Sequence, residues 1–304
     1  MRSVVRCAAL TLVLLVAPAG ARATVGRLSF SLLAGGGYSS DVFLRAGLGP
    51  DGLLQVTPSG RLDLSLAPRW KLTAVADTSY GHAPSSGFDS LAESASLEAR
   101  WLGGEIWEVS LEAAGEHVSY SLDVPLEGGA AGPAVSSTTA GRLSSLLRLR
   151  SLGFEWRTAG LVAARSSTSE SGDVPETELA LLAGAVRPLG AKVSLAVTYK
   201  LAHTDSTRPD LALTSHAVFG LLSWRLWALG LQAQLQLQTA SPDSGAREDL
   251  GRFTLSAALP IAASLDLEAV YSLASTRTND PDIPAATRHL VFLGLRWRVL
   301  ETTW

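Results

Sequence analysis

The chain has 304 residues, of which 47% are hydrophobic and 17% are charged, and its formal net charge is −3. A mildly acidic chain without basic runs is a poor candidate for nucleic-acid binding. The one cysteine, Cys7, lies in an N-terminal segment that we expect to be removed, so neither a disulfide nor thiolate chemistry is expected in the mature protein.

The N-terminus has the pattern of a secretory signal peptide. Two arginines in the first six residues precede an apolar run at 7–16, and an Ala-x-Ala site ends at Ala23. We therefore predict a signal peptide at 1–23, cleavage after Ala23, and a single domain at 24–304. No apolar run in that domain approaches the ~20 residues of a membrane helix.

Beyond the signal peptide, apolar and polar residues alternate. Between Leu229 and Leu237 the odd positions are Leu or Ala, and Gln232, Gln234 and Gln236 lie between them. A period of two over ten or more residues predicts β-strands longer than the ~5–6 residues usual in soluble proteins. Apolar character without an apolar run is typical of a transmembrane β-barrel.

We count about fourteen such segments (12–16) and no convincing helix. Two of them, 177–187 and 213–226, alternate poorly because both of their faces are apolar. The predicted strands are 28–40, 53–66, 69–81, 92–102, 105–120, 139–150, 153–167, 177–187, 190–204, 213–226, 228–239, 249–259, 262–276 and 287–299.

Short and long connections alternate along the chain. Short ones are predicted near 67–68, 103–104, 151–152, 188–189, 227–228 and 260–261, and long ones at 41–52, 82–91, 121–138, 168–176, 205–212, 240–248 and 277–286. This predicts a closed antiparallel transmembrane β-barrel with short periplasmic turns and long external loops. The longest connection, 121–138, is expected to be an external loop, with folding into the interior as the alternative.

Aromatic residues fall into two groups. Tryptophans lie near the short turns, and tyrosines lie toward the long loops, as expected for two lipid–water interfaces. The predicted interface aromatics are Trp70, Trp101, Trp107, Trp156, Trp224, Trp297, Tyr38, Tyr80, Tyr199 and Tyr271. The rival fold is a secreted soluble β-sandwich, whose strands also alternate. Strand length argues against it, and a soluble barrel of fourteen strands would be too wide for side chains to fill.

Together, the signal peptide, the amphipathic strands, the alternating turn lengths and the terminal Trp304 resemble a bacterial outer-membrane β-barrel, similar in size and strand number to small monomeric fourteen-stranded porins. The segment 36–43, Gly-Gly-Tyr-Ser-Ser-Asp-Val-Phe, is similar to the opening of many proteobacterial surface barrels. The resemblance implies the outer membrane of a Gram-negative bacterium, with outer-membrane lipids and the barrel-assembly machinery as partners. The chain departs from these families in one respect. Their terminal aromatic is in phase with the lipid-facing residues of the last strand, whereas here those residues have odd numbers and Trp304 has an even one.

The face opposite the Leu, Val and Trp positions is expected to line a pore. In it, Asp266 is predicted opposite Arg298 and Glu268 opposite Arg296. Acidic and basic residues on two successive strands predict segregated walls that face one another, and a surplus of cations predicts weak anion preference. The predicted pore-lining residues are Arg61, Lys71, Arg100, Glu108, Glu112, Glu116, Arg142, Arg148, Arg150, Arg157, Lys200, Gln232, Gln234, Gln236, Arg252, Asp266, Glu268, Arg296 and Arg298.

Residues able to do chemistry are few. One pair, His117 and Ser119, resembles the outward His-x-Ser pair of outer-membrane phospholipases and lipid A deacylases. The third member is missing, because Glu93 is expected about a turn lower and Asn279 is far along the chain. We therefore predict no enzyme, no metal site and no cofactor. The histidines, all near long loops and on the lipid-facing parity, are interpreted as interfacial residues: His82, His117, His203, His216 and His289.

The sequence thus favours a passive pore for small hydrophilic solutes with weak anion preference. The alternative is a structural or docking barrel of an envelope export, adhesion or motility complex, which apolar inward residues in 177–187 and 213–226 would suit. A further alternative is an outer-leaflet lipid acyl hydrolase built on His117 and Ser119.

Overall fold

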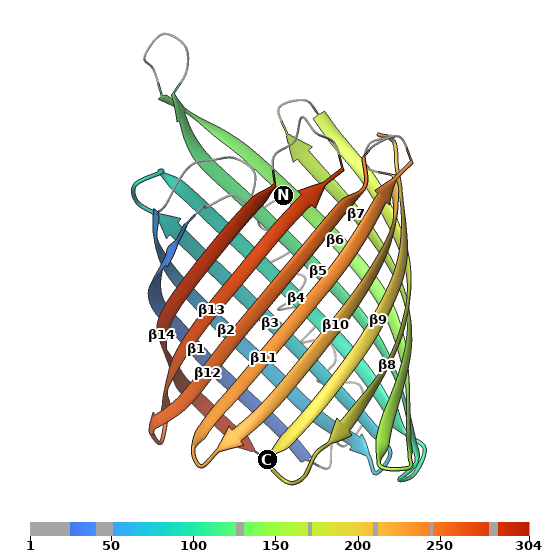
Figure 1. The fold of residues 1–304 in the computed structure, drawn as a ribbon. Coiled ribbons are helices and arrows are strands. Elements are labelled where there is room, and N and C mark those ends of the chain that lie inside the picture. Colours follow the sequence, from blue (N-terminus) through green and yellow to red (C-terminus); the bar gives the residue numbers. More distant parts are fainter. Residues whose placement is uncertain are drawn as a thin grey trace.

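The strands form one closed antiparallel barrel in a computed structural model of the chain (Figure 1). The structure describes residues 25–40, 51–125, 131–169, 172–208, 212–243, 246–279 and 285–303. The predicted signal peptide at 1–23, its cleavage after Ala23, the end of the 36–43 motif and Trp304 lie outside these residues. The described part contains no helix long and apolar enough to cross a membrane.

The described residues form fourteen strands, which confirms the predicted fold class and strand number. They run as β1 (Val25–Ser39), β2 (Asp51–Ala67), β3 (Trp70–Ala83), β4 (Phe88–Leu102), β5 (Trp107–Pro125), β6 (Ala131–Ser151), β7 (Phe154–Ser169), β8 (Gly172–Pro188), β9 (Val193–Ser206), β10 (Leu213–Leu226), β11 (Leu229–Pro242), β12 (Glu248–Ala262), β13 (Leu265–Thr278) and β14 (Ala286–Thr303).

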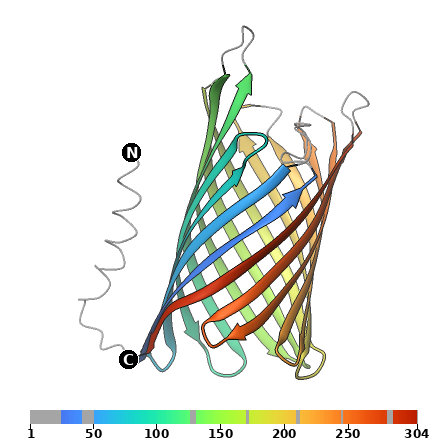
Figure 2. The same ribbon diagram turned by 90° about the vertical axis from the view of Figure 1, so that its left-hand side faces the viewer.

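Each strand pairs with its neighbours in the sequence, and β14 closes the barrel on β1 (Figure 2). The strands have 14 to 21 residues, which exceeds the roughly 9–11 residues that a tilted strand needs to cross hydrocarbon. Tight connections at 68–69, 152–153 and 227–228 lie at one end of the barrel, which we call the short-turn end. The opposite end is called the long-loop end.

The seam between β1 and β14 depends on glycine. A Cβ atom added to Gly35 would collide with the backbone of Leu293 and Gly294 and with the ring of Phe292. A Cβ atom added to Gly294 would lie 2.8 Å from the Phe292 ring and 3.0 Å from Leu33. Glycine at these positions therefore lets a buried phenylalanine cover the seam from its inner side.

A β-bulge near the end of β14 changes which residue numbers face outward at the C-terminus. Phe30 is opposite Leu300, but Ser31 is opposite Arg298, so one residue of β14 is left over between them. Leu300 and Thr302 consequently share the face of their partners Phe30 and Leu28, although both numbers are even. The predicted odd parity of the outward face therefore holds only up to the bulge.

The predicted loop at 121–138 is mostly strand. β5 and β6 pair up to Pro125 and Ala131, and their hairpin rises above the neighbouring strands at the long-loop end (Figure 1). The described parts of this segment continue the barrel wall instead of entering the interior. Thr and Val, which favour strands, lie at 135–139 where pairing continues, although the polar composition of this stretch predicts a loop. The predicted loop at 168–176 is shortened in the same way.

Candidate functional site

The two faces of the barrel wall follow from the strand registers, because directly opposite residues of paired strands point to the same side. One face carries exposed leucines such as Leu54, Leu181 and Leu293, which are 57%, 65% and 54% exposed. The other face carries Glu108 and Ser110, which are buried although polar. Side chains crowd together on a concave surface and spread apart on a convex one, so the polar face is the interior.

The registers place all of the predicted pore-lining residues on the inner face. Those on β2–β7 are Arg61, Lys71, Arg100, Glu108, Glu112, Glu116, Arg142, Arg148, Arg150 and Arg157. Those on β9 and β11–β14 are Lys200, Gln232, Gln234, Gln236, Arg252, Asp266, Glu268, Arg296 and Arg298.

A chain of ion pairs crosses the inner face of β4–β7. Arg100 Nη2 donates to Glu98 at 2.8 Å, and its Nε lies 3.2 Å from Glu108 Oε1. The same Glu108 oxygen accepts from Arg148 Nη1 at 2.8 Å. Arg148 Nε lies 3.9 Å from Glu155. Because Glu108 is buried and shared by two arginines, it is the central acceptor of this chain.

Acidic and basic residues on β5 and β6 pair directly, which corrects the prediction of segregated walls facing one another. Besides the Glu108–Arg148 pair, Arg142 Nη2 donates to Glu112 at 2.9 Å. These two strands are neighbours, so their charges meet side by side and neutralise locally. The arrangement therefore contains no acidic wall opposite a basic one on these strands.

The two ion pairs predicted between β13 and β14 are present. Arg298 Nη2 donates to Asp266 at 2.8 Å, and Arg296 donates to both carboxylate oxygens of Glu268. The backbone register is offset, because Asp266 is opposite Arg296, so both pairs run diagonally. A further pair, between Arg27 and Glu301 at 2.6 Å, was missed because the bulge brings Glu301 to the inner face.

The inner face of β9–β12 has a different composition. Gln232, Gln234 and Gln236 of β11 are opposite Ser256, Thr254 and Arg252 of β12, respectively. In the described residues, Arg252 has no ion-pair or hydrogen-bonding partner. On the inner face, β8 and β9 are bridged by an ion pair between Lys200 Nζ and Glu178 Oε1 at 2.6 Å.

Apolar residues also reach the interior. Leu182 and Val186 of β8 lie on the inner face, opposite Lys200 and Ala196 of β9. On β10, Phe219 and Leu221 share the inner face with the glutamines of β11. These positions explain why 177–187 and 213–226 alternate poorly in the sequence.

All of the predicted interface aromatics lie on the outer face. At the short-turn end, the rings of Trp101 and Trp107 make an edge contact with centroids 4.4 Å apart. On β3, Trp70 and Tyr80 are ten residues apart. At roughly 3.3 Å per residue and a tilt near 40°, that spacing is about 25 Å along the barrel axis, the height of the apolar band in outer-membrane barrels.

The five histidines lie on the outer face toward the long-loop end, and each contacts a polar neighbour through Nδ1. Within the described residues no three His, Cys, Asp or Glu side chains are close enough to hold a metal ion. The contacts are His82 with Asp89 at 2.8 Å, His117 with Thr139 at 2.9 Å, His203 with Thr214 at 3.1 Å, His216 with Tyr199 at 2.6 Å and His289 with Tyr271 at 3.0 Å.

The register corrects the placement of Glu93, which lies directly opposite His117 and not a turn lower. His117 nevertheless uses Nδ1 for Thr139, and Ser119 is opposite Leu91. In the described part of the chain, Ser119 and His117 share no hydrogen bond. The base–hydroxyl contact that acyl transfer requires is therefore not formed here.

No family model matches the sequence, and no curated protein matches it either. Solved structures with a similar fold include a loop L8 deletion mutant of OmpT, an outer membrane protein of Vibrio cholerae. It has 11% identity and a TM-score of 0.54, with 92% of this chain and 99% of that chain covered. The deltaS2 mutant of TodX, a monoaromatic hydrocarbon channel, has 9% identity and a TM-score of 0.53, with coverages of 90% and 89%.

The toluene transporter TodX of P. putida is also similar, with 9% identity, a TM-score of 0.51 and coverages of 91% and 90%. At these identities the similarity concerns the fold alone. The closed wall, the polar inner face and the two outer aromatic groups agree with it. The chain therefore has the fold of the bacterial outer-membrane β-barrels.

Proposed function

We propose that this chain is a monomeric, non-enzymatic outer-membrane barrel that forms a passive pore for small hydrophilic solutes with weak anion preference. The observation that carries the proposal is the inner face, where ion pairs and glutamines line the wall while the outer face exposes leucines. Export by the predicted signal peptide and insertion by the barrel-assembly machinery belong to the same proposal.

The barrel is wide enough for a pore. Fourteen strands spaced ~4.8 Å apart and tilted by about 40° give a backbone diameter of roughly 28 Å. Side chains just fill barrels of eight strands, whereas porins of sixteen to eighteen strands hold an aqueous channel, so fourteen strands favour an interior with room for water. In the described residues all strands belong to the wall.

A small surplus of positive charge supports the anion preference. Among the described residues, Lys71, Arg225 and Arg252 lie on the inner face without an ion pair, against the carboxylates of Asp77 and Glu116. The ion-pair chain of β4–β7 adds one more arginine than glutamate, since it contains Arg100, Arg148, Arg150 and Arg157 against Glu98, Glu108 and Glu155.

Reconstitution into liposomes tests the proposal. Refolded mature protein should let small sugars enter, and reversal potentials in planar bilayers under a salt gradient should show weak anion preference. Liposomes that stay impermeable to sugars would contradict the pore, and clear cation selectivity would contradict the anion preference.

A second candidate is a docking barrel of an envelope complex, and the inner Leu182, Phe219 and Leu221 favour it. These side chains would contact a segment inserted into the interior. The same liposomes distinguish the two functions, because a docking barrel would be impermeable and would co-purify from envelopes with a protein partner.

A further inference from the structure

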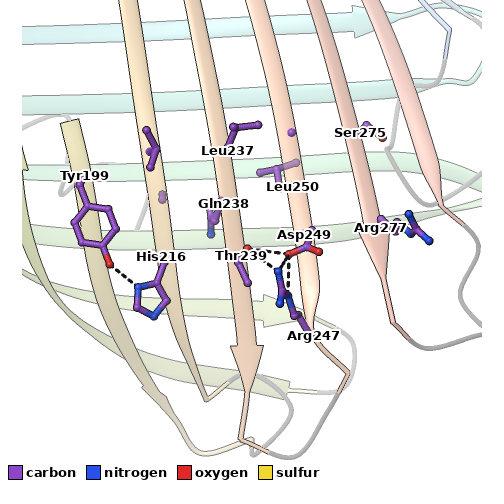
Figure 3. Close-up of a pocket in the computed structure, with 13 residues that line it drawn as sticks. Tyr199, His216, Leu237, Gln238, Thr239, Arg247, Asp249, Leu250, Ser275 and Arg277 are labelled. Atoms are coloured by element: carbon purple, nitrogen blue, oxygen red, sulfur yellow. Dashed lines mark hydrogen bonds and ion pairs between the residues drawn. The ribbon is translucent and has the colours of Figure 1, made fainter. Parts of the chain in front are cut away.

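A pocket of about 520 Å³ lies on the outer wall near the long-loop end, across β9–β13 (Figure 3). Its volume is within the roughly 300–1,000 Å³ of small-molecule sites. A pocket on this face opens away from the interior and cannot serve the pore. If the chain resides in a membrane as proposed above, a lipid is its neighbour there.

One side of the pocket is a polar row. His216, Thr239, Asp249 and Arg277 are successive register partners on β10–β13, so they share the outer face. Asp249 Oδ1 accepts from Thr239 at 2.8 Å and from Arg247 Nε at 3.0 Å, which holds Arg247 against the wall. Figure 3 shows these contacts and the separate position of Arg277.

Arg277 is exposed, and it has no hydrogen-bonding or ion-pair partner in the part of the chain that the structure describes. Together with Arg247, which Asp249 holds beside it, the polar row has two arginines against one aspartate and a net positive charge, on a chain whose overall charge is negative. Arginine binds phosphate through paired N–H donors, and Arg247 still has donors that Asp249 does not use. The row is therefore complementary to a phosphate.

The next row toward the middle of the barrel is mainly apolar, and it is recessed at Gly251. Val218, Leu237, Gly251 and Ser275 are successive register partners on the same face. At Gly251 an added Cβ atom would meet only Leu237 Cδ2, at 3.9 Å, so the space above this glycine is open. The groove between Leu237 and Ser275 has the shape and the chemistry for a hydrocarbon chain.

The height of the pocket suits a lipid headgroup. His216 is eight residues from Trp224 on β10, which is about 20 Å along the barrel axis at roughly 3.3 Å per residue and 40° tilt. The polar row therefore lies near the interface opposite the tryptophans, where Tyr199 also lies. An arginine on the outer face costs only ~0–1 kcal/mol at that depth, against ~2–4 kcal/mol at the midplane.

We propose that this pocket binds a phosphate-bearing lipid, with its phosphate on Arg247 and Arg277 and an acyl chain in the groove over Gly251. Charge complementarity above an apolar recess selects this occupant over an uncharged lipid. The inference rests on the proposed residence in a membrane, but it is independent of the pore.

Native mass spectrometry of the refolded, detergent-solubilised protein tests the site. The probes are dioleoyl phosphatidic acid, dioleoylglycerol with the same chains but no phosphate, and inorganic phosphate. Phosphatidic acid should bind at least about tenfold more tightly than either of the others, because charged hydrogen bonds and chain burial act together. Equal binding of the two lipids, or equal binding of inorganic phosphate and phosphatidic acid, would overturn the proposal.

Two variants separate the parts of the site. Arg277→Gln should weaken phosphatidic acid binding about tenfold. Gly251→Leu should fill the groove and weaken phosphatidic acid binding while leaving the weak inorganic phosphate signal unchanged. The matched control is Arg187→Gln, which removes an outer-face arginine that packs 4.8 Å over Phe154 at the other end of the barrel. If Arg277→Gln and Arg187→Gln bind phosphatidic acid equally well, the proposed site is wrong.

Other results lead to different conclusions. A dimer that disappears in Gly251→Leu would make a second copy of the chain the occupant and would overturn the lipid. Protein that inserts into vesicles and conducts, yet shows no preference for phosphatidic acid, would overturn this inference alone. Protein that fails to insert into vesicles would overturn the proposed function itself. Retained heat-modifiable migration on gels checks that each variant is folded.

Discussion

On β4–β7 the inner wall is a chain of ion pairs, whereas on β9–β12 it consists mainly of uncharged Gln, Ser, Thr and Ala side chains. A charge removed from water needs a partner, so each member of the ion-pair chain depends on its neighbours. An amide or hydroxyl carries no net charge, so it loses less on removal from water and depends less on its neighbours. The first region therefore couples side chains across strands more strongly than the second does.

The largest effect is expected from Glu108→Gln in the ion-pair chain. The substitution leaves Arg100 and Arg148 without their shared carboxylate, and Arg148 Nε is already buried without a hydrogen-bonding partner among the described residues. We expect the free energy of unfolding in detergent micelles to fall by about 3 kcal/mol, measured by urea titration. The matched control is Glu116→Gln on the same face of β5, where no ion pair is described. Equal losses in the two variants would contradict the coupling.

A smaller effect is expected for the Lys200–Glu178 pair, which bridges β8 and β9 at the edge of the uncharged region. A double-mutant cycle with Lys200→Gln and Glu178→Gln should give a coupling energy of about 0.5–1 kcal/mol, as for a cross-strand pair with access to water. A coupling energy of about 3 kcal/mol, the size of the loss expected for Glu108→Gln, would show that ion pairs in the two regions contribute equally to stability.

The smallest effect is expected from Arg252→Gln, which removes an unpaired inner charge. Stability should be unchanged, because no described partner is lost. A unit charge about 10 Å from the path of an ion favours an anion and disfavours a cation by about 0.4 kcal/mol each in water, so the anion-to-cation permeability ratio should fall by at most about fourfold, and less with salt screening. Reversal potentials measure this change, and an unaltered potential together with lower stability would show that Arg252 is a structural residue.

Much of the fold could be predicted from alternation alone. The glutamines and leucines of β11 assign its two faces without further information, since successive side chains of a strand point to opposite sides. The same rule places the predicted inner charges and outer aromatics on their faces. It also anticipated the Arg296–Glu268 and Arg298–Asp266 pairs, because diagonal and direct partners are both within reach of long side chains.

Several of the errors concern register. Glu93 lies opposite His117 because the length of the β4–β5 connection sets the register of that pair. Glu301 reaches Arg27 because of a bulge that the sequence pattern does not predict. The outer pocket was missed for the same reason: Arg277, Asp249 and Gly251 come from separate strands and become neighbours only when those strands are aligned.

Period-two alternation is thus enough to assign most residues to the inside or the outside of this barrel, because that choice depends only on neighbours along one strand. The exceptions are β8 and β10, which are apolar on both faces, and the end of β14 beyond its bulge. Which residues are neighbours on either face depends on the register between paired strands. That register is determined by the turn lengths, by the bulge in β14 and by the glycine-dependent seam with β1. The ion-pair chain and the outer pocket accordingly became visible only in the closed barrel.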